Sequence, residues 1–156
     1  MEPYSALLVL FFGAFPSFEA RYAIPFAIVL GFPPGWAFFF GILGNLLPII
    51  PLLLLLGPVS DWLRSRSTLM ERFFTWVFDR TRKNEALIAR WGVYALFLFV
   101  AIPLPGTGVW TGAAMAFVFN IEWKQAFVAI SCGAVVAALI TTLPTLGLLN
   151  LFKAIP

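Results

Sequence analysis

The sequence predicts an all-α integral membrane protein with two inverted repeats, each a re-entrant helical hairpin followed by a transmembrane helix. Three observations lead to this prediction. The composition is strongly apolar, proline-containing breaks interrupt two short apolar segments, and the two halves of the chain resemble each other. A basic segment separates the halves, and we expect it to be an amphipathic cytoplasmic linker.

The composition places the chain in a lipid bilayer. Hydrophobic residues make up 62% of the 156 residues and charged residues 11%, and the mean hydropathy is +0.97. Soluble domains contain roughly 45 to 50% apolar and about 25% charged residues. Residues 36–56 and 126–149 carry no charge, and each run meets the requirement of roughly 20 residues for crossing the hydrocarbon core. We therefore expect one multi-pass domain, residues 1–156, in the cell (inner or plasma) membrane.

Residues 60–91 form a polar segment that holds seven of the ten basic residues. These are Arg64, Arg66, Arg72, Arg80, Arg82, Lys83 and Arg90. An excess of Lys and Arg marks cytoplasmic loops, and aromatic residues among the charges are typical of a helix that lies in the headgroup plane. Nucleic-acid binding is the rival interpretation of a basic stretch. We expect no nucleic-acid partner, because this segment is tethered between membrane spans.

The segments on either side, residues 4–57 and 92–150, match at a separation of 87 positions. Pro16 matches Pro103 and Trp36 matches Trp123, and several Phe and Ala residues match as well. Broken segments at corresponding positions of two halves are typical of transporters built from inverted repeats. The matches therefore predict an internal repeat.

The short apolar segments are too short to cross a bilayer. As helices, residues 4–15 would rise about 18 Å and residues 93–102 about 15 Å, against a hydrocarbon thickness of about 30 Å. The return arms, residues 23–31 and 112–119, are shorter still. We expect two re-entrant hairpins that enter from opposite sides, so that their tips meet near the centre and both termini lie outside. The alternative is four bent spans, with both termini in the cytoplasm.

The first break carries charge inside an apolar stretch, at Glu19 and Arg21. An ionisable residue in mid-membrane costs roughly 2.5 to 3.5 kcal/mol and is first a candidate functional site. Residues two apart lie on the same side of an extended strand, so an extended tip would direct both side chains into one cavity. Glu19 would then be the carboxylate that exchanges protons at mid-depth. The alternative is a solvated loop, residues 16–22, between two ordinary hydrophobic segments.

The second break reads Pro103-Leu104-Pro105-Gly106-Thr107-Gly108-Val109-Trp110-Thr111-Gly112. Its prolines stop the incoming helix, and its glycines permit backbone geometry that other residues avoid. Exposed amides at the start of a returning helix, expected from about Val109, can form an anion-binding nest, with the hydroxyls of Thr107 and Thr111 as further partners. A tight turn that uses glycine only for packing is the alternative.

The two tip motifs resemble a known family. Pro-x-x-Glu-x-Arg-x-Ala-Ile-Pro, here Pro16–Pro25, and Pro-Leu-Pro-Gly-Thr-Gly-x-Trp-Thr-Gly, here Pro103–Gly112, look like the small multidrug export proteins. That family is similar in architecture to the DedA membrane protein superfamily, whose members have paired re-entrant loops and are associated with proton-dependent transport and with moving lipid headgroups. The resemblance implies that Glu19 and Arg21 belong to the first loop and that the glycines Gly106 and Gly108 belong to the second.

The predicted substrate or proton site draws on both tips and one further residue. Its members are Glu19, Arg21, Pro16, Pro25, Pro103, Pro105, Gly106, Thr107, Gly108, Trp110, Thr111 and Asn45. Asn45 is expected to hydrogen-bond to a neighbouring helix or to contact the ligand. Trp110 is expected either at the site or as an anchor at the membrane interface.

A membrane transporter is the leading functional hypothesis: proton-coupled secondary transport of a small amphipathic or organic-cation substrate. The alternatives are a DedA-like lipid or polyprenyl-phosphate translocase and a structural or assembly membrane protein. No enzyme, cofactor or metal is expected, because the chain has no histidine and no Gly-Lys-Ser/Thr phosphate loop. We expect membrane lipid and protons or a small molecule as partners, and a homodimer because 156 residues are few for a closed pathway. The single cysteine, Cys132, is expected to pack in the core.

Overall fold

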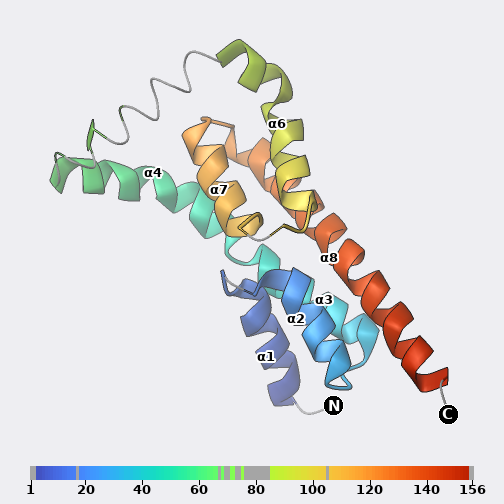
Figure 1. Cartoon of the computed structure of the whole chain (residues 1–156). Coiled ribbons are helices and arrows are strands. Elements are labelled where there is room, and N and C mark those ends of the chain that lie inside the picture. The colour runs from blue at the N-terminus through green and yellow to red at the C-terminus, as the bar shows by residue number, and fades with distance from the viewer. Residues whose placement is uncertain are drawn as a thin grey trace.

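A computed structural model describes residues 3–16, 18–66, 68, 71–72, 75, 85–104 and 106–154, and the regular elements within these ranges are all α-helices (Figure 1). They are α1 (Pro3–Ala14), α2 (Glu19–Val29), α3 (Pro34–Leu46), α4 (Ile49–Arg66), α6 (Glu85–Ala101), α7 (Val109–Val118) and α8 (Trp123–Ala154). The all-helical prediction is therefore confirmed for the described part of the chain.

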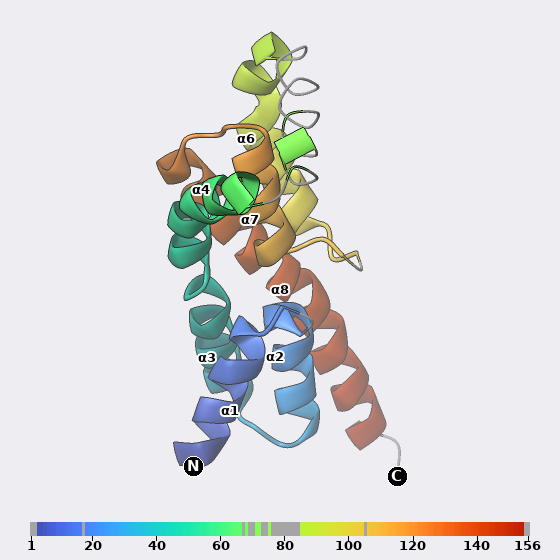
Figure 2. The same ribbon diagram turned by 90° about the vertical axis from the view of Figure 1, so that its left-hand side faces the viewer.

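Two short helical hairpins face each other tip to tip. Helices α1 and α2 form one hairpin and α6 and α7 the other, and their tips meet at the centre of the molecule in both views (Figures 1 and 2). Helix α1 begins and α8 ends at the same end of the molecule, while α6 begins at the opposite end. This arrangement brings the two proline-containing breaks together.

The ends of the helices explain why the chain turns where it does. Pro103 has no N–H to extend α6 beyond Ala101, and Gly106 and Gly108 adopt positive φ angles of 82° and 147° that glycine tolerates best. The two returning helices, α2 and α7, end with the same type of hydrogen bond at the end away from the tips. The N–H of Phe32 bonds to the carbonyl of Ala27, and the N–H of Ile121 bonds to that of Ala116, each at 2.9 Å, as in a Schellman motif.

Similar closing bonds recur at a constant spacing in the two halves of the chain. Phe32 and Ile121 are 89 positions apart, and the bonds Ala37 N to Pro33 O and Ala126 N to Glu122 O, both 2.9 Å, repeat at the same separation. Trp123 thus begins α8 as Pro34 begins α3, and the sequence match of Trp36 with Trp123 does not join equivalent positions.

One pair of similar contacts before the tips is separated by 87 positions. A β-carbon added to Gly44 would meet the carbonyl of Leu10, and one added to Gly133 would meet that of Phe97. Leu10 and Phe97 are 87 apart, whereas Gly44 and Gly133 are 89 apart. Counted between helix ends, the second tip is also the longer one, with residues 102–108 between α6 and α7 against residues 15–18 between α1 and α2.

Within the described part of the chain, two helical segments are long and apolar enough to cross a membrane, judged by length and composition. They are Pro34–Trp62 and Trp123–Leu151, each of 29 residues. The first is bent, because a turn at residues 47–48 separates α3 from α4 (Figure 1). The predicted span 36–56 is therefore two helices, and Pro48, which has no N–H to donate, lies in the turn.

The helices extend into the polar segment from both ends. Helix α4 continues to Arg66 and α6 starts at Glu85, so the boundaries predicted for the linker, residues 60–91, do not coincide with helix ends. The amphipathic helix predicted within this segment lies largely outside the described residues.

Two apolar clusters hold the hairpins, and α8 contributes to both. One cluster joins α6, α7 and α8 through buried residues that include Leu96, Val109 and Ile130. The other joins α1, α2 and α3 through Val9, Ile24 and Ala37, with Ala138 of α8. Cys132 is exposed and does not pack in the core, because it faces away from the buried side of α8 that carries Gly133 and Ala134.

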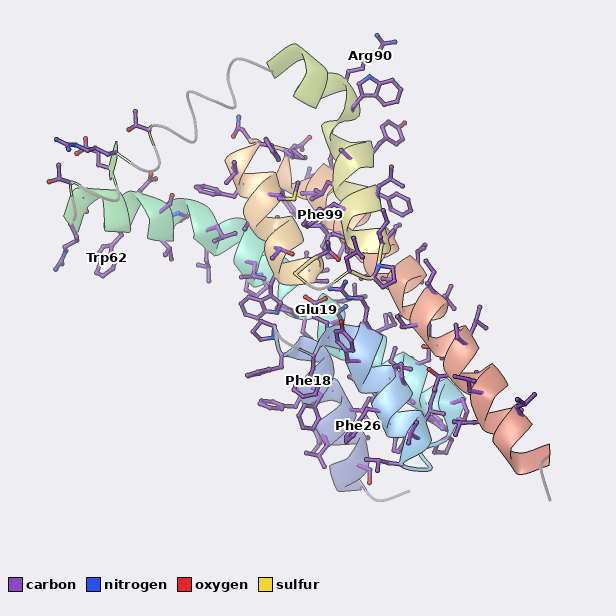
Figure 3. The ribbon with its side chains drawn as sticks, in the orientation of Figure 1. Phe18, Glu19, Phe26, Trp62, Arg90 and Phe99 are labelled. Atoms are coloured by element: carbon purple, nitrogen blue, oxygen red, sulfur yellow. The ribbon has the colours of Figure 1, made fainter. Side chains whose placement is uncertain are left out.

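The outer surface is also apolar. Side chains such as Phe26, Trp62 and Leu143 are more than half exposed (53%, 56% and 64%), and Figure 3 shows Trp62 pointing away from α4. Monomeric soluble proteins rarely expose large contiguous apolar patches. The outer surface is therefore that of a protein surrounded by lipid.

Candidate functional site

The first tip places its two charged residues at the start of α2. Glu19 is the first residue of this helix and has a φ angle of +51°, which is uncommon for a residue other than glycine, asparagine or aspartate. Such a backbone conformation costs of the order of 1–3 kcal/mol and gathers at functional sites. The predicted extended tip is therefore wrong, although the left-handed turn at Glu19 still brings both side chains to one side.

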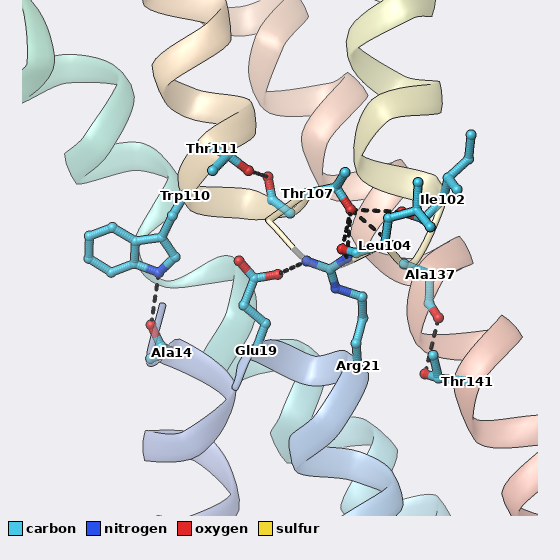
Figure 4. Close-up of polar contacts among 11 residues, drawn as sticks. Ala14, Glu19, Arg21, Ile102, Leu104, Thr107, Trp110, Thr111, Ala137 and Thr141 are labelled. Carbon is cyan, nitrogen blue, oxygen red and sulfur yellow. Dashed lines mark hydrogen bonds and ion pairs between the residues drawn. The ribbon is translucent and has the colours of Figure 1, made fainter. Parts of the chain in front are cut away.

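Glu19 and Arg21 form a buried ion pair, with side chains 5% and 6% exposed. Nη2 of Arg21 donates to Oε2 of Glu19 at 2.9 Å. Nη1 crosses to the second tip, where it donates to the carbonyl of Leu104 at 3.1 Å and to Oγ1 of Thr107 at 2.8 Å (Figure 4). The guanidinium thus links the two hairpins, and its planar fork makes this possible.

The carboxylate of Glu19 lies at the start of α7, where the sequence predicts an anion-binding nest. Its oxygens lie against Gly108, and the backbone N–H groups of Val109 and Trp110, in the first turn of α7, interact electrostatically with this carboxylate. The positive end of the helix dipole favours an anion there. Gly108 makes room for the arrangement, because a β-carbon on it would meet both Glu19 and Arg21.

The hydroxyl of Thr107 holds the second tip in shape. Its Oγ1 lies 2.8 Å from the carbonyl oxygens of both Ile102 and Leu104 and receives the N–H of Leu104 at 3.2 Å. One hydroxyl can donate a single hydrogen bond and accept two. The bond from Arg21 and the bond from Leu104 fill its acceptor positions, so the loop geometry and the cross-tip contact depend on one side chain.

Trp110 forms the second cross-tip contact. Its indole Nε1 donates to the carbonyl of Ala14, the last residue of α1, at 3.1 Å (Figure 4). The terminal carbonyls of a helix have no intrahelical partner, and the indole satisfies one of them. Trp110 is therefore a residue of the tip junction and not an anchor at the membrane interface.

A cavity of about 550 Å³ lies at the junction of the tips. Both hairpins contribute to its walls, which are formed by Pro16, Phe18, Glu19, Arg21, Tyr22, Leu104, Gly106, Thr107, Trp110 and Thr111. Three of these are aromatic, and two carry opposite charges. A mostly apolar cavity with a few convergent polar groups is the usual form of a small-molecule site.

Most residues of the predicted site line this cavity or touch the ion pair. Pro25 and Pro103 do neither. Pro25 lies within α2, where it cannot supply an N–H to the carbonyl of Arg21 one turn earlier, and Pro103 follows the end of α6. Pro105 lies outside the described residues. The cavity residues that sequence reasoning missed are Phe18, Tyr22 and Leu104, which carry no chemical signature in so apolar a chain.

Asn45 does not line the cavity. It is buried in α3, with 1% of its surface exposed, and within the described ranges its Oδ1 has no hydrogen-bond partner. The interhelical hydrogen bond expected of this residue is therefore not formed through Oδ1.

The fold and the site together define a helical membrane protein in which two opposed hairpins line a charged cavity. The family model described as "Putative small multi-drug export protein" matches residues 19–140, which include both tips from Glu19 onward. The chain belongs to this family. Comparisons with curated proteins and with solved structures gave no match.

Proposed function

We propose that this protein is a proton-coupled secondary transporter that exports a small amphipathic organic cation through the cavity between the two tips. The observation that carries the proposal is the buried Glu19–Arg21 pair in the wall of that cavity. Ionisable residues inside a membrane domain are functional candidates, because burying them is costly. The family description, which concerns drug export, supports the substrate class.

In this proposal the hairpins are re-entrant and the two halves are inverted repeats in the cell membrane. Helices α1 and α2 contain 12 and 11 residues, which corresponds to about 18 and 17 Å and is too short to cross about 30 Å of hydrocarbon. The matching backbone bonds of the two halves support the repeat. Both termini would lie outside and residues 60–91 in the cytoplasm, because that segment holds most of the basic residues.

The cavity offers an organic cation both charge and aromatic surface. Among the described residues that line the cavity, Glu19 supplies the carboxylate. Phe18, Tyr22 and Trp110 present rings on which a cation can lie. A cation would take the place of a proton, or of Arg21, beside the carboxylate. Proton and substrate would then compete for Glu19, and this competition is the basis of exchange transport.

Translocation of an anionic lipid headgroup, as in DedA-like proteins, is the second candidate. One observation favours it: Arg21 and the amides of Val109 and Trp110 converge on a carboxylate, and the same donors suit a phosphate. A phosphate would first have to displace Glu19 from this position. This candidate therefore requires a larger rearrangement than the first.

The experiment is transport in proteoliposomes with an imposed pH gradient, for the native protein and for Glu19→Gln. Efflux of a fluorescent lipophilic cation and movement of a headgroup-labelled phospholipid are measured on the same preparations. We expect cation efflux that follows the gradient and falls at least tenfold in the variant. Lipid movement without cation efflux would favour the second candidate, and neither activity would favour a structural or assembly role.

A further inference from the structure

Arg21 and Trp110 occupy equivalent positions in the two halves, 89 residues apart. Each lies in the first turn of the second arm of its hairpin. Each donates a side-chain N–H to a backbone carbonyl near the end of the first arm of the other hairpin. Arg21 donates to Leu104 and Trp110 to Ala14, both at 3.1 Å. The two hairpins thus hold each other by reciprocal bonds, which we call the Arg21 clasp and the Trp110 clasp.

Glu19 lies between the two clasps (Figure 4). Its carboxylate pairs with Arg21 on one side and interacts with the backbone N–H of Trp110 on the other. Both clasp side chains also line the cavity, as does Thr107, which completes the Arg21 clasp. Any separation of the tips that exposes Glu19 must therefore stretch or break at least one clasp.

We infer that Trp110 is a positioning residue which, together with Arg21, keeps the tips closed over Glu19, so that protons reach this carboxylate only when the clasps open. This inference rests on the proposed function, because it assigns Glu19 the proton. It adds a role for the indole N–H, which is to hold the end of α1 and thereby keep Glu19 on the amides of α7. Loss of either clasp should allow protons to cross the membrane without transport of substrate.

The contacts allow this role to be tested with closely matched variants. Trp110→Phe keeps an aromatic ring and removes the N–H. Thr107→Val keeps the shape and removes the hydroxyl that receives Arg21, whereas Thr107→Ser keeps that hydroxyl. Trp36→Phe is the aromatic control, because Trp36 is 51% exposed on α3 and lies outside the cavity residues.

The first measurement is hydrogen exchange of the whole protein in lipid nanodiscs, which requires no transport activity. A net hydrogen bond is worth about 1 kcal/mol, so each clasp variant should speed exchange roughly fivefold. The acceleration should appear at both tips, residues 11–19 and 102–110, because each clasp joins the two hairpins. In the Thr107→Ser and Trp36→Phe variants, hydrogen exchange at both tips should be as slow as in the native protein. Acceleration confined to the substituted hairpin, or none, would overturn the inference.

The second measurement is proton leak into liposomes without substrate. Trp110→Phe and Thr107→Val should each leak faster than the native protein, and the double variant should exceed the sum of the two. A lower unfolding temperature with no leak would assign Trp110 a structural role and refute the gating one. If the native protein transports neither test substrate, the proposed function fails, yet the exchange data still decide whether the clasps join the tips.

Discussion

Gly108 lies against the carboxylate of Glu19, with no space between them for a β-carbon. The same absent side chain would also meet Nη2 of Arg21. The ion pair therefore rests directly on the backbone of the opposite hairpin. This close approach lets the amides that follow Gly108 reach the carboxylate.

Replacing Gly108 with Ala should destroy the site, whereas replacing Gly106 should not. Both glycines have positive φ, so each substitution costs roughly 1–2 kcal/mol of backbone strain. A β-carbon at Gly106 would meet nothing within 4 Å, while one at Gly108 would displace the ion pair. Thermal unfolding and transport of the two variants provide the measurement. Equal loss of function in both would mean that strain, and not contact, makes the glycines necessary.

Glu19→Gln should remove the response of transport to a pH gradient while leaving a folded protein. The amide oxygen of Gln can still accept the bond from Nη2 of Arg21, and the remaining bonds of Arg21 to Leu104 and Thr107 are unchanged. Transport across a pH gradient checks this, with Glu122→Gln, an exposed carboxylate outside the cavity, as the control. A variant that keeps its pH dependence would show that the proton binds elsewhere.

Arg21→Lys should impair transport of either substrate class. Arginine uses two nitrogens to reach three acceptors, on Glu19, Leu104 and Thr107, and a single ammonium group cannot reproduce that planar fork. We expect at least a tenfold loss in both the cation and the lipid assay, with a lower unfolding temperature. Full activity in either assay would mean that the charge alone suffices.

Both termini should be outside the cell and residues 60–91 inside. The start of α1 and the end of α8 lie at one end of the molecule, and the basic residues of the polar segment favour the cytoplasm. Reporter fusions at Met1 and Pro156 measure this. Cytoplasmic reporters at both ends would support the four-span arrangement instead.

Gly44→Ala should destabilise the protein, whereas Gly57→Ala should not. A β-carbon on Gly44 would meet the carbonyl of Leu10 where α1 packs on α3, and overpacking of this kind costs about 1–3 kcal/mol. Nothing lies within 4 Å of a β-carbon on Gly57, where alanine favours the helix by up to about 1 kcal/mol. Unfolding in detergent compares the two, and equal midpoints would contradict the packing argument.

Much of the site could be predicted, because its charged residues and its proline- and glycine-containing break stand out in an apolar chain. Glu19 and Arg21 interrupt an apolar stretch, and the prolines and glycines before Val109 fix both the break and the start of α7. Such signals are local and depend on residue type alone.

Other features depend on contacts between distant segments, which one sequence does not reveal. The bond from Trp110 to Ala14 spans 96 positions, and Glu19, with its φ angle of +51°, lies against Gly108 from the other half of the chain. The apolar run 36–56 resembles a single span, and a kink could be expected at Pro48, but the separation of the run into two helices could not be predicted. The separation of 87 was inferred from matches on both sides of the tips, whereas the matching backbone bonds after the tips are 89 positions apart.

The longer second tip also bears on direction. If the protein alternates between two access states, as the proposed transport requires, its tips exchange roles, and tips that differ in length and in sequence give the two states different free energies. A difference of about 1.4 kcal/mol already gives a tenfold excess of one state. Under the proposed function, the empty protein should therefore rest facing one side of the membrane, and the unequal tips should contribute to that preference.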